Sequence, residues 1–215
     1  EQVADYFVAY ADMINAPIHC GVEVLKVKSN DGCPGFRVET SHGSIEANNV
    51  IAATGPFQCP LIPDLIPKNE SITQIHSKDY FNPEQLPEGA VLVVGAGSSG
   101  AQIADELLLA GKSVYLSVGP HDLPPRSYRG RDFVWWLGVL GKWEAITKDP
   151  SMDHVTIAVS GAHGGHTVDF RRLAGQGITL LGRTKSFKNN VMHFASDLAK
   201  NIANGNAYTL SLLDQ

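Results

Sequence analysis

The sequence has few cysteines and no motif that would use them. Cys20, Cys33 and Cys59 are the only three, and none forms a CxxC pair. This number and spacing disfavour a disulfide scaffold and a zinc site, and they fit a reducing cytoplasm better than a secreted environment. The HxxH pair of His163 and His166 has no carboxylate or cysteine beside it in the sequence, so we expect no bound metal.

Long apolar runs and an excess of positive charge are also missing. The most apolar helical stretch, FVWWLGVLG at 133–141, is far too short to span a bilayer. The net charge of −5 gives no general attraction for nucleic acid or for an anionic membrane. We expect no signal peptide, because the first residues lack its pattern of a charged start and an apolar run. We therefore expect a cytoplasmic protein with a small-molecule substrate, without nucleic-acid binding or membrane insertion; a homodimer is compatible with these properties.

What the sequence does contain is a glycine-rich turn between an apolar strand and a helix. VLVVGAGSSGAQIADELLLAG carries the pattern GxGxxG at Gly95, Gly97 and Gly100. In this pattern the first glycine permits a tight turn, the second lets the backbone approach a pyrophosphate, and the third lets the helix pack on the strand. The pyrophosphate lies at the helix N-terminus, where Ser98 and Ser99 add hydroxyl donors. The context predicts a dinucleotide site, although such a turn can also exist without a ligand.

The second strand of this unit, KSVYLSV at 112–118, lacks the acid that NAD and FAD sites use. It ends at Ser117 and Val118, where an NAD or FAD site would normally have a carboxylate that holds the ribose hydroxyls. Arg126 and Arg129 follow in a loop, and a guanidinium forms paired, charge-assisted hydrogen bonds with a 2′-phosphate. We therefore expect NADP(H) rather than NAD(H), bound by these arginines. The alternative is that they are solvated and that Asp122 is a displaced acidic residue.

Residues 1–55 have a different pattern. A short amphipathic helix is expected first, followed by three antiparallel strands within 22–47, separated by turns that contain Asn, Ser and Gly. The alternation of apolar residues slips by one position before Val27, which indicates an irregularity in the first strand. NNVIAATG at 48–55 is expected to form a buried strand.

The remaining chain divides into three segments. Prolines make 56–89 unsuited to a helix, and this segment is expected to be a hinge. Residues 90–190 are expected to form the nucleotide-binding domain, with helices over 99–110 and 132–141 and a further, short helix capped by Thr167. A helical tail is expected over 191–215.

Four stretches together resemble the flavin-containing monooxygenases, and most closely bacterial members described as flavoproteins associated with cation transport. They are the glycine turn, ATG at 53–55, IHSKDY at 75–80 and GHTVDFRRLAGQGITLLGRT at 165–184. In that family one GxGxxG unit binds FAD, and a second unit, inserted into the FAD domain, binds NADPH. The resemblance implies that 1–55 is part of an FAD domain and that the turn at 95–100 is the NADPH turn. It also implies that the FAD domain resumes beyond the printed sequence.

The resemblance also assigns expected roles to single residues. Thr54 and Gly55 are expected near the flavin and the linker between the domains. His76 and Tyr80 match the last two positions of the family fingerprint FxGxxxHxxx(W/Y), whereas its phenylalanine and glycine are replaced. His76 is therefore expected either to position the cofactors or to be a structural loop residue, and no catalytic side chain can be named.

The expected fold class is α/β. It comprises a Rossmann-like NADP-binding domain with a parallel sheet and part of an FAD domain with a small antiparallel β-meander. The expected function of the intact protein is FAD- and NADPH-dependent monooxygenation, in which NADPH reduces the flavin before oxygen is activated. The alternatives are a nucleotide-binding fragment without activity and a flavoprotein reductase that passes electrons to a partner. Because the sequence has a single GxGxxG, it is expected to bind FAD poorly.

Overall fold

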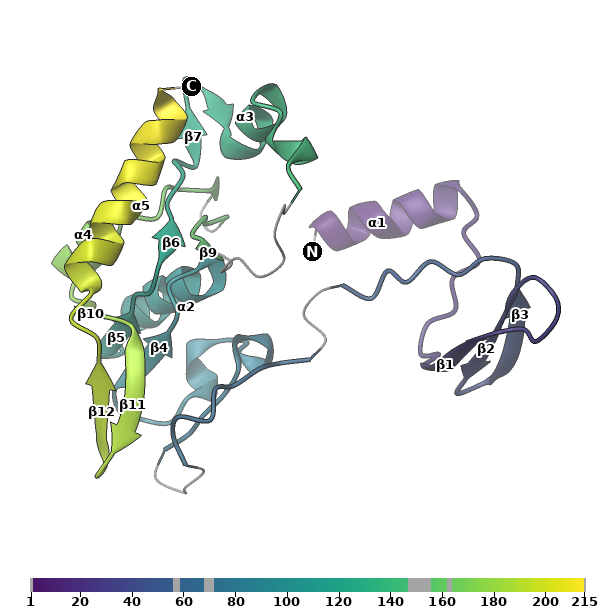
Figure 1. The fold of residues 1–215 in the computed structure, drawn as a ribbon, viewed down its shortest axis with the longest axis horizontal. Helices are drawn as coiled ribbons and strands as arrows, with labels where there is room; N and C mark the ends of the chain where they lie inside the picture. The colour runs from purple at the N-terminus through teal and green to yellow at the C-terminus, as the bar shows by residue number, and fades with distance from the viewer. Residues whose placement is uncertain (1, 56–58, 68–71, 147–155, 162–163, 215) are drawn as a thin grey trace. The chain divides into compact units, whose positions relative to one another are not determined.

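The computed structural model describes residues 2–55, 59–67, 72–146, 156–161 and 164–214 (Figure 1). The chain divides into two compact units, Glu1–Gln58 and Cys59–Gln215, which we call unit 1 and unit 2. The helices are α1 (Gln2–Met13), α2 (Ser98–Leu109), α3 (Phe133–Val139), α4 (Phe170–Gly175) and α5 (Leu198–Leu213), with 3-10 turns η1 (Ser77–Asp79), η2 (Pro83–Gln85) and η3 (Lys142–Glu144). The strands are β1 (Val24–Ser29), β2 (Phe36–Thr40), β3 (Gly43–Ala47), β4 (Val91–Val94), β5 (Val114–Ser117), β6 (His121–Asp122), β7 (Ser127–Tyr128), β8 (Arg131–Asp132), β9 (Thr156–Ile157), β10 (Thr179–Leu181), β11 (Thr184–Lys188) and β12 (Val191–Phe194).

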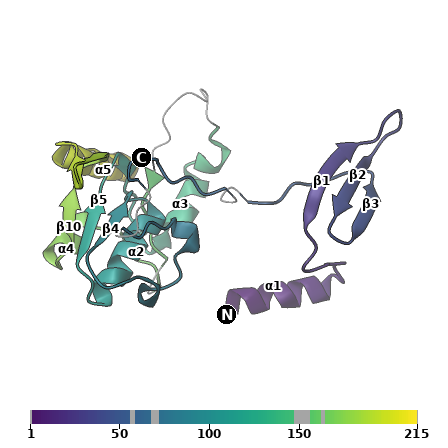
Figure 2. The ribbon, with the colours of Figure 1, turned by 90° about the horizontal axis from the view of Figure 1, so that it is seen from below.

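Unit 1 contains α1 and an antiparallel meander. Its three strands lie in the order β1–β2–β3, side by side in Figure 2. The register of β1 against β2 shifts between Val24 and Lys26. This irregularity lies just before Val27, so the slip expected from the alternation of apolar residues is confirmed.

The strand expected over 48–55 is not formed. Val50 is 38% exposed and Ile51 is 90% exposed, and neither belongs to a described strand. A strand exists only where a neighbour accepts its backbone hydrogen bonds, and within the described part of unit 1 no strand pairs with this segment. The apolar, β-branched composition of this segment is therefore not sufficient by itself to form a strand.

Unit 2 is built around a parallel sheet of three strands in the order β10–β5–β4. The chain runs from β4 through α2 to β5 and later adds β10 on the far side of β5, which is the order of the first half of a doubly wound fold. Helix α2 buries Ala101, Ala104 and Leu107 against this sheet. The expected parallel sheet, with a helix across it and a separate meander, is therefore confirmed, and the fold class is α/β.

The short helix α4 begins at a different cap from the expected one. The carboxylate of Asp169 accepts hydrogen bonds from the backbone N–H groups of Arg171 (2.9 Å) and Arg172 (3.2 Å). The hydroxyl of Thr167 instead accepts a hydrogen bond from the backbone N–H of Arg126 (2.9 Å). An aspartate directly before the helix is the better placed of the two to satisfy the free amides of the first turn.

The tail is also not helical throughout. Residues Val191–Phe194 form β12, which pairs with β11, and the last helix begins only at Leu198. Asn189 and Asn190 join the two strands and both have left-handed φ angles, of 51° and 59°. Such two-residue turns match the twist of a hairpin, and asparagine tolerates them better than most residues do. Because this turn makes a hairpin, the helix expected over 191–215 begins only at Leu198.

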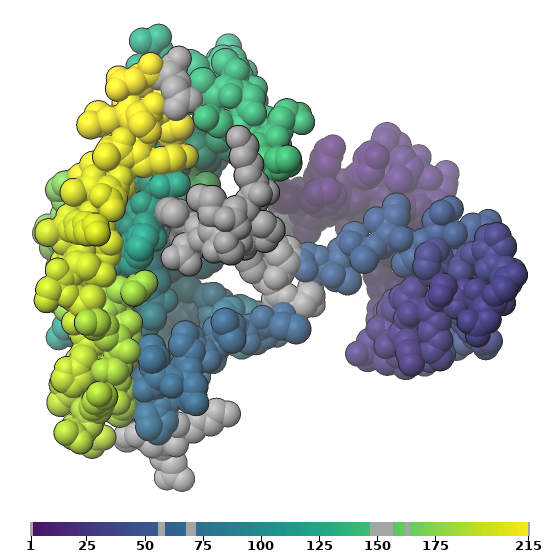
Figure 3. All heavy atoms as spheres, viewed as in Figure 1, coloured from purple at the N-terminus to yellow at the C-terminus, as the bar shows by residue number. Residues whose placement is uncertain are grey.

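Helix α5 runs along the chain that leaves β5. Figure 3 shows it in yellow along one side of unit 2, with the β11–β12 hairpin in yellow-green at its lower end. Three contacts join the two segments in the same order along both: the Asn201 amide donates to the Val118 carbonyl (3.0 Å), the backbone at Gly205 lies against the His121 imidazole, and the Thr209 hydroxyl donates to the Leu123 carbonyl. The chain after β5 thus follows α5 from its N-terminal part towards its C-terminal part.

None of the helices in the described ranges is long and apolar enough to cross a membrane.

Candidate dinucleotide-binding site

The glycine turn has the geometry that a phosphate cradle requires. Gly95 has a φ of +101°, which side-chain-bearing residues rarely adopt, and its N–H donates to the Ser117 carbonyl (3.1 Å). A Cβ atom on Gly100 would overlap the carbonyl oxygen of Gly95 and lie 3.0 Å from its carbonyl carbon. Helix α2 can therefore begin directly over the turn only because position 100 carries no side chain.

The first turn of α2 offers backbone donors to an anion. Gly97 is the N-cap, and the N–H groups that follow a helix start have no partner within the helix. The Ser98 hydroxyl donates to the Ile157 carbonyl (2.9 Å) and accepts from the Val159 N–H (3.0 Å). Ser98 therefore ties the β9 segment to α2, whereas Ser99 is exposed. The binding of a pyrophosphate by these groups stays a prediction.

The carboxyl end of β5 lies next to this turn and presents no acid. Ser117 is buried, and its hydroxyl donates to the Gly182 carbonyl (3.0 Å) and accepts from the Thr184 N–H (3.1 Å). Val118 is also buried. The side chain of Ser117 is thus used to join β5 to the chain after β10, and it is not presented to a ribose.

The two arginines expected to bind a 2′-phosphate lie around the small β7–β8 hairpin. The Arg126 guanidinium is paired with the Asp132 carboxylate (2.9 Å) and is 27% exposed. Arg129 has a φ of +48°, and its guanidinium carbon lies 5.1 Å from the centre of the Tyr128 ring. Phosphate binding by either arginine stays a prediction.

The fingerprint residues attach the segment before β4 to unit 2. The Nδ1 atom of His76 accepts a hydrogen bond from the Lys78 N–H (3.1 Å) and caps η1. The Tyr80 hydroxyl donates to the Glu106 carboxylate on α2 (3.0 Å), and burial together with this carboxylate raises the pKa of Tyr80. His76 thus has a structural role in this loop, and its role in positioning cofactors stays a prediction.

Thr54 and Gly55 belong to unit 1. Both are exposed, and Gly55 has a φ of +74°. Their expected position near a flavin stays a prediction.

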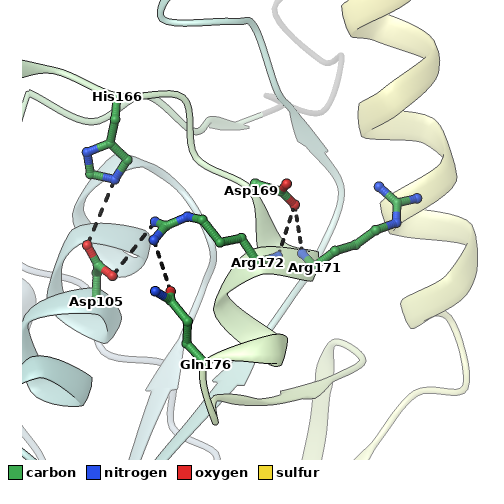
Figure 4. Close-up of polar contacts among 6 residues, drawn as sticks. All are labelled: Asp105, His166, Asp169, Arg171, Arg172 and Gln176. Atoms are coloured by element: carbon green, nitrogen blue, oxygen red, sulfur yellow. Dashed lines mark hydrogen bonds and ion pairs between the residues drawn. The ribbon is translucent and has the colours of Figure 1, made fainter.

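A polar cluster joins α2 to α4 (Figure 4). Asp105, whose side chain is 15% exposed, lies 3.8 Å from His166 Nε2 and 3.9 Å from an Arg172 nitrogen, and Arg172 also donates to the Gln176 side chain (2.9 Å). Both acids of this helix have partners far away in the sequence: Asp105 is mostly buried between His166 and Arg172, whereas Glu106 is exposed and accepts a hydrogen bond from the Tyr80 hydroxyl. Within the described part of the chain, no three potential ligands come together to hold a metal; His163 lies outside it.

Asp197, which directly precedes α5, holds the loop after β10. Its carboxylate accepts a hydrogen bond from the Arg183 N–H (3.0 Å). This bond, with smaller contributions from the Asn201 side chain and the charge of Arg183, keeps the pKa of Asp197 below its usual range. The ionised carboxylate therefore stabilises the fold.

The stability of unit 2 is expected to fall at acid pH partly because of Asp197. Since its pKa is lower in the folded state, its contribution is present above the unfolded pKa of about 3.9 and is lost as the pH falls through the folded pKa. Asp197→Asn should lower the melting temperature at neutral pH and flatten its decline below about pH 4. Fluorescence can follow this unfolding because Trp135, Trp136 and Trp143 all lie in unit 2. The matched control is Glu88→Gln at an exposed acid; a decline as steep in Asp197→Asn as in this control would contradict the assignment.

The sequence matches the family described as "Pyridine nucleotide-disulphide oxidoreductase" over residues 1–129, which include the glycine turn and β5. The chain belongs to this family. It is 44% identical over 144 residues to "Uncharacterized oxidoreductase CzcO-like" of Geobacillus kaustophilus, a match that covers 66% of this chain and 40% of the relative. It is 34% identical over 118 residues to "Thiol-specific monooxygenase" of Saccharomyces cerevisiae, covering 52% of this chain and 27% of that protein.

Solved structures support the same fold. A variant of flavin monooxygenase from Stenotrophomonas maltophilia superposes with a TM-score of 0.61 at 21% identity, covering 89% of this chain and 50% of that one. The resemblance to flavin monooxygenases and to the bacterial CzcO-like group is confirmed. The chain spans about two fifths of the length of the bacterial curated relatives that it matches.

Proposed function

We propose that unit 2 binds NADPH and that the protein is an NADPH-dependent flavoprotein monooxygenase. The two cofactors supply the chemistry of such an enzyme, namely hydride transfer from NADPH to FAD and oxygen activation on the reduced flavin. The residues of this chain would bind NADPH and fix its orientation. The activity is a property proposed for the whole protein, of which this chain carries the nucleotide-binding part.

The observation that carries the proposal is the β4–turn–α2 geometry. The positive φ of Gly95 and the close approach of Gly100 to the Gly95 carbonyl leave room for a phosphate at the start of α2. There the free backbone N–H groups and the helix dipole favour an anion, and Ser99 adds an exposed hydroxyl. These residues fit a dinucleotide pyrophosphate.

The choice of NADPH over NADH is supported by the end of β5. An acid at this place would bind the ribose hydroxyls of NADH and repel a 2′-phosphate, and Ser117 and Val118 provide none. Nothing at these two positions opposes the additional negative charge of NADPH.

A flavoprotein reductase is the second candidate, because the family description includes disulphide oxidoreductases. Such enzymes commonly exchange electrons through a pair of nearby cysteines. Cys20, Cys33 and Cys59 are exposed, free and without CxxC spacing, which favours the monooxygenase.

Calorimetric titration of the chain with NADPH and NADH tests the proposal. We expect saturable binding of NADPH that is tighter than binding of NADH. Turnover by the whole protein with FAD bound then separates the two candidates: a monooxygenase consumes oxygen as NADPH is oxidised, whereas a reductase needs an added disulfide or protein acceptor. Absence of binding of either coenzyme would contradict the proposal.

A further inference from the structure

Arg183 lies over the carboxyl end of β5. It is the second residue after β10, the strand that pairs directly with β5. A Cβ atom placed on Gly119 would lie 3.9 Å and 4.0 Å from two methylene carbons of Arg183. The stem of this exposed side chain therefore passes just beside the residues that follow β5, where the adenosine ribose of a dinucleotide is bound in folds of this kind.

Arg126 lies much farther from this strand end. The contacts along α5 pair Val118 with Asn201 and Leu123 with Thr209. Positions 201 and 209 are separated by about 12 Å along a helix. Leu123 therefore lies about 12 Å farther along α5 than Val118 does, and Arg126 comes after Leu123 in the chain. Figure 1 agrees: β7, which follows Arg126, lies by the C-terminal end of α5, whereas β5 and β10 lie near its N-terminal end.

The charges around the two arginines also leave Arg183 more available than Arg126 to bind an anion. Arg126 is neutralised by Asp132 at 2.9 Å. Arg183 forms no ion pair with a carboxylate in the described part of unit 2. Its charge contributes to the lowered pKa of Asp197, whose carboxylate is already held by a hydrogen bond from the Arg183 backbone N–H. The guanidinium of Arg183 is therefore the more available of the two for a phosphate.

We infer that Arg183, and not Arg126, receives the 2′-phosphate and makes the site selective for NADPH. The guanidinium would donate two parallel hydrogen bonds to phosphate oxygens, while its stem packs on the Gly119 backbone. Gly119 suits this role because a larger side chain would compete for the same space. This inference rests on the proposed NADPH site and names the residue that determines its selectivity.

The test compares Arg183→Gln with Arg126→Gln and with Lys185→Gln, which removes an exposed charge two residues farther along. Each variant is titrated calorimetrically with NADPH, NADH, 2′,5′-ADP and 5′-AMP. Arg183→Gln should weaken the binding of NADPH and of 2′,5′-ADP about ten- to a hundredfold, the range that charge-assisted hydrogen bonds give. Its affinity for NADH and 5′-AMP should stay unchanged. Arg126→Gln and Lys185→Gln should both keep the wild-type ratio of NADPH affinity to NADH affinity.

Two outcomes would overturn the inference while leaving the proposed function in place. One is a selective loss of NADPH binding in Arg126→Gln but not in Arg183→Gln. The other is an equal loss of NADPH and NADH in Arg183→Gln, which would give Arg183 a structural role only. Wild-type protein that binds neither coenzyme would instead contradict the proposed function itself.

Discussion

Gly100→Ala is expected to lower the free energy of unfolding of unit 2 by about 3 kcal/mol and to abolish NADPH binding. The new methyl group would overlap the carbonyl oxygen of Gly95, which is backbone and cannot rotate away as a side chain can. Helix α2 would have to move off the turn, and the backbone donors at its start would lose their common direction. Urea unfolding followed by tryptophan fluorescence measures the first effect, and calorimetric titration with NADPH measures the second.

Gly175→Ala is the matched control for this substitution. Gly175 is also helical, but a Cβ atom there meets no atom within 4 Å. This variant should be as stable as the wild type, or slightly more stable, because alanine favours a helix over glycine by up to about 1 kcal/mol. If Gly100→Ala were as stable as Gly175→Ala and bound NADPH normally, the cradle described for this turn would be incorrect.

The second large effect is expected at Gly182→Ala, with a loss of about 2–3 kcal/mol in the free energy of unfolding. A Cβ atom at this position would overlap the Ala195 carbonyl oxygen and lie 2.6 Å from the Asp197 carboxylate. The substitution would push β10 away from the end of the β11–β12 hairpin and weaken the bond between Asp197 and the Arg183 N–H. Urea unfolding should show the loss of stability, and the ratio of NADPH to NADH affinity should fall because Arg183 is displaced.

Gly119→Ala provides the comparison on the same edge of the sheet. Its Cβ atom would meet Arg183 only at ordinary van der Waals distances of 3.9 Å and 4.0 Å, so its stability should change by less than about 0.5 kcal/mol. Equal effects of the two substitutions would show that the packing between Gly182 and the hairpin is looser than the structure indicates.

The parts of the fold that could be predicted from the sequence depend on neighbours within one turn or one strand. The glycine turn at 95–100, the apolar strand before it and the helix after it are encoded by adjacent residues. The irregularity in β1 was visible as a slip in the alternation before Val27. These signals are local, and no distant residue competes with them.

The missed features depend on partners distant in the sequence. Glu106 is bonded to Tyr80, and Asp105 lies between His166 and Arg172, and no spacing rule connects these positions. The proximity of Arg183 to Gly119 follows from the pairing of β10 with β5, which a single sequence does not reveal. The strand β12 did have a local signal, since two adjacent asparagines before a β-branched residue are typical of a hairpin turn.

The most direct test of the account is to map bound NADPH on the backbone of this chain. In a titration followed by amide NMR, the account predicts saturable shifts that are largest at Gly97–Ala101, with a second group at Gly119 and Arg183. NADH should perturb the first group and leave the second group less affected. Saturable shifts confined to residues outside these two groups, or no shifts at all at the start of α2, would contradict the assignment of unit 2 as the NADPH-binding part of the protein.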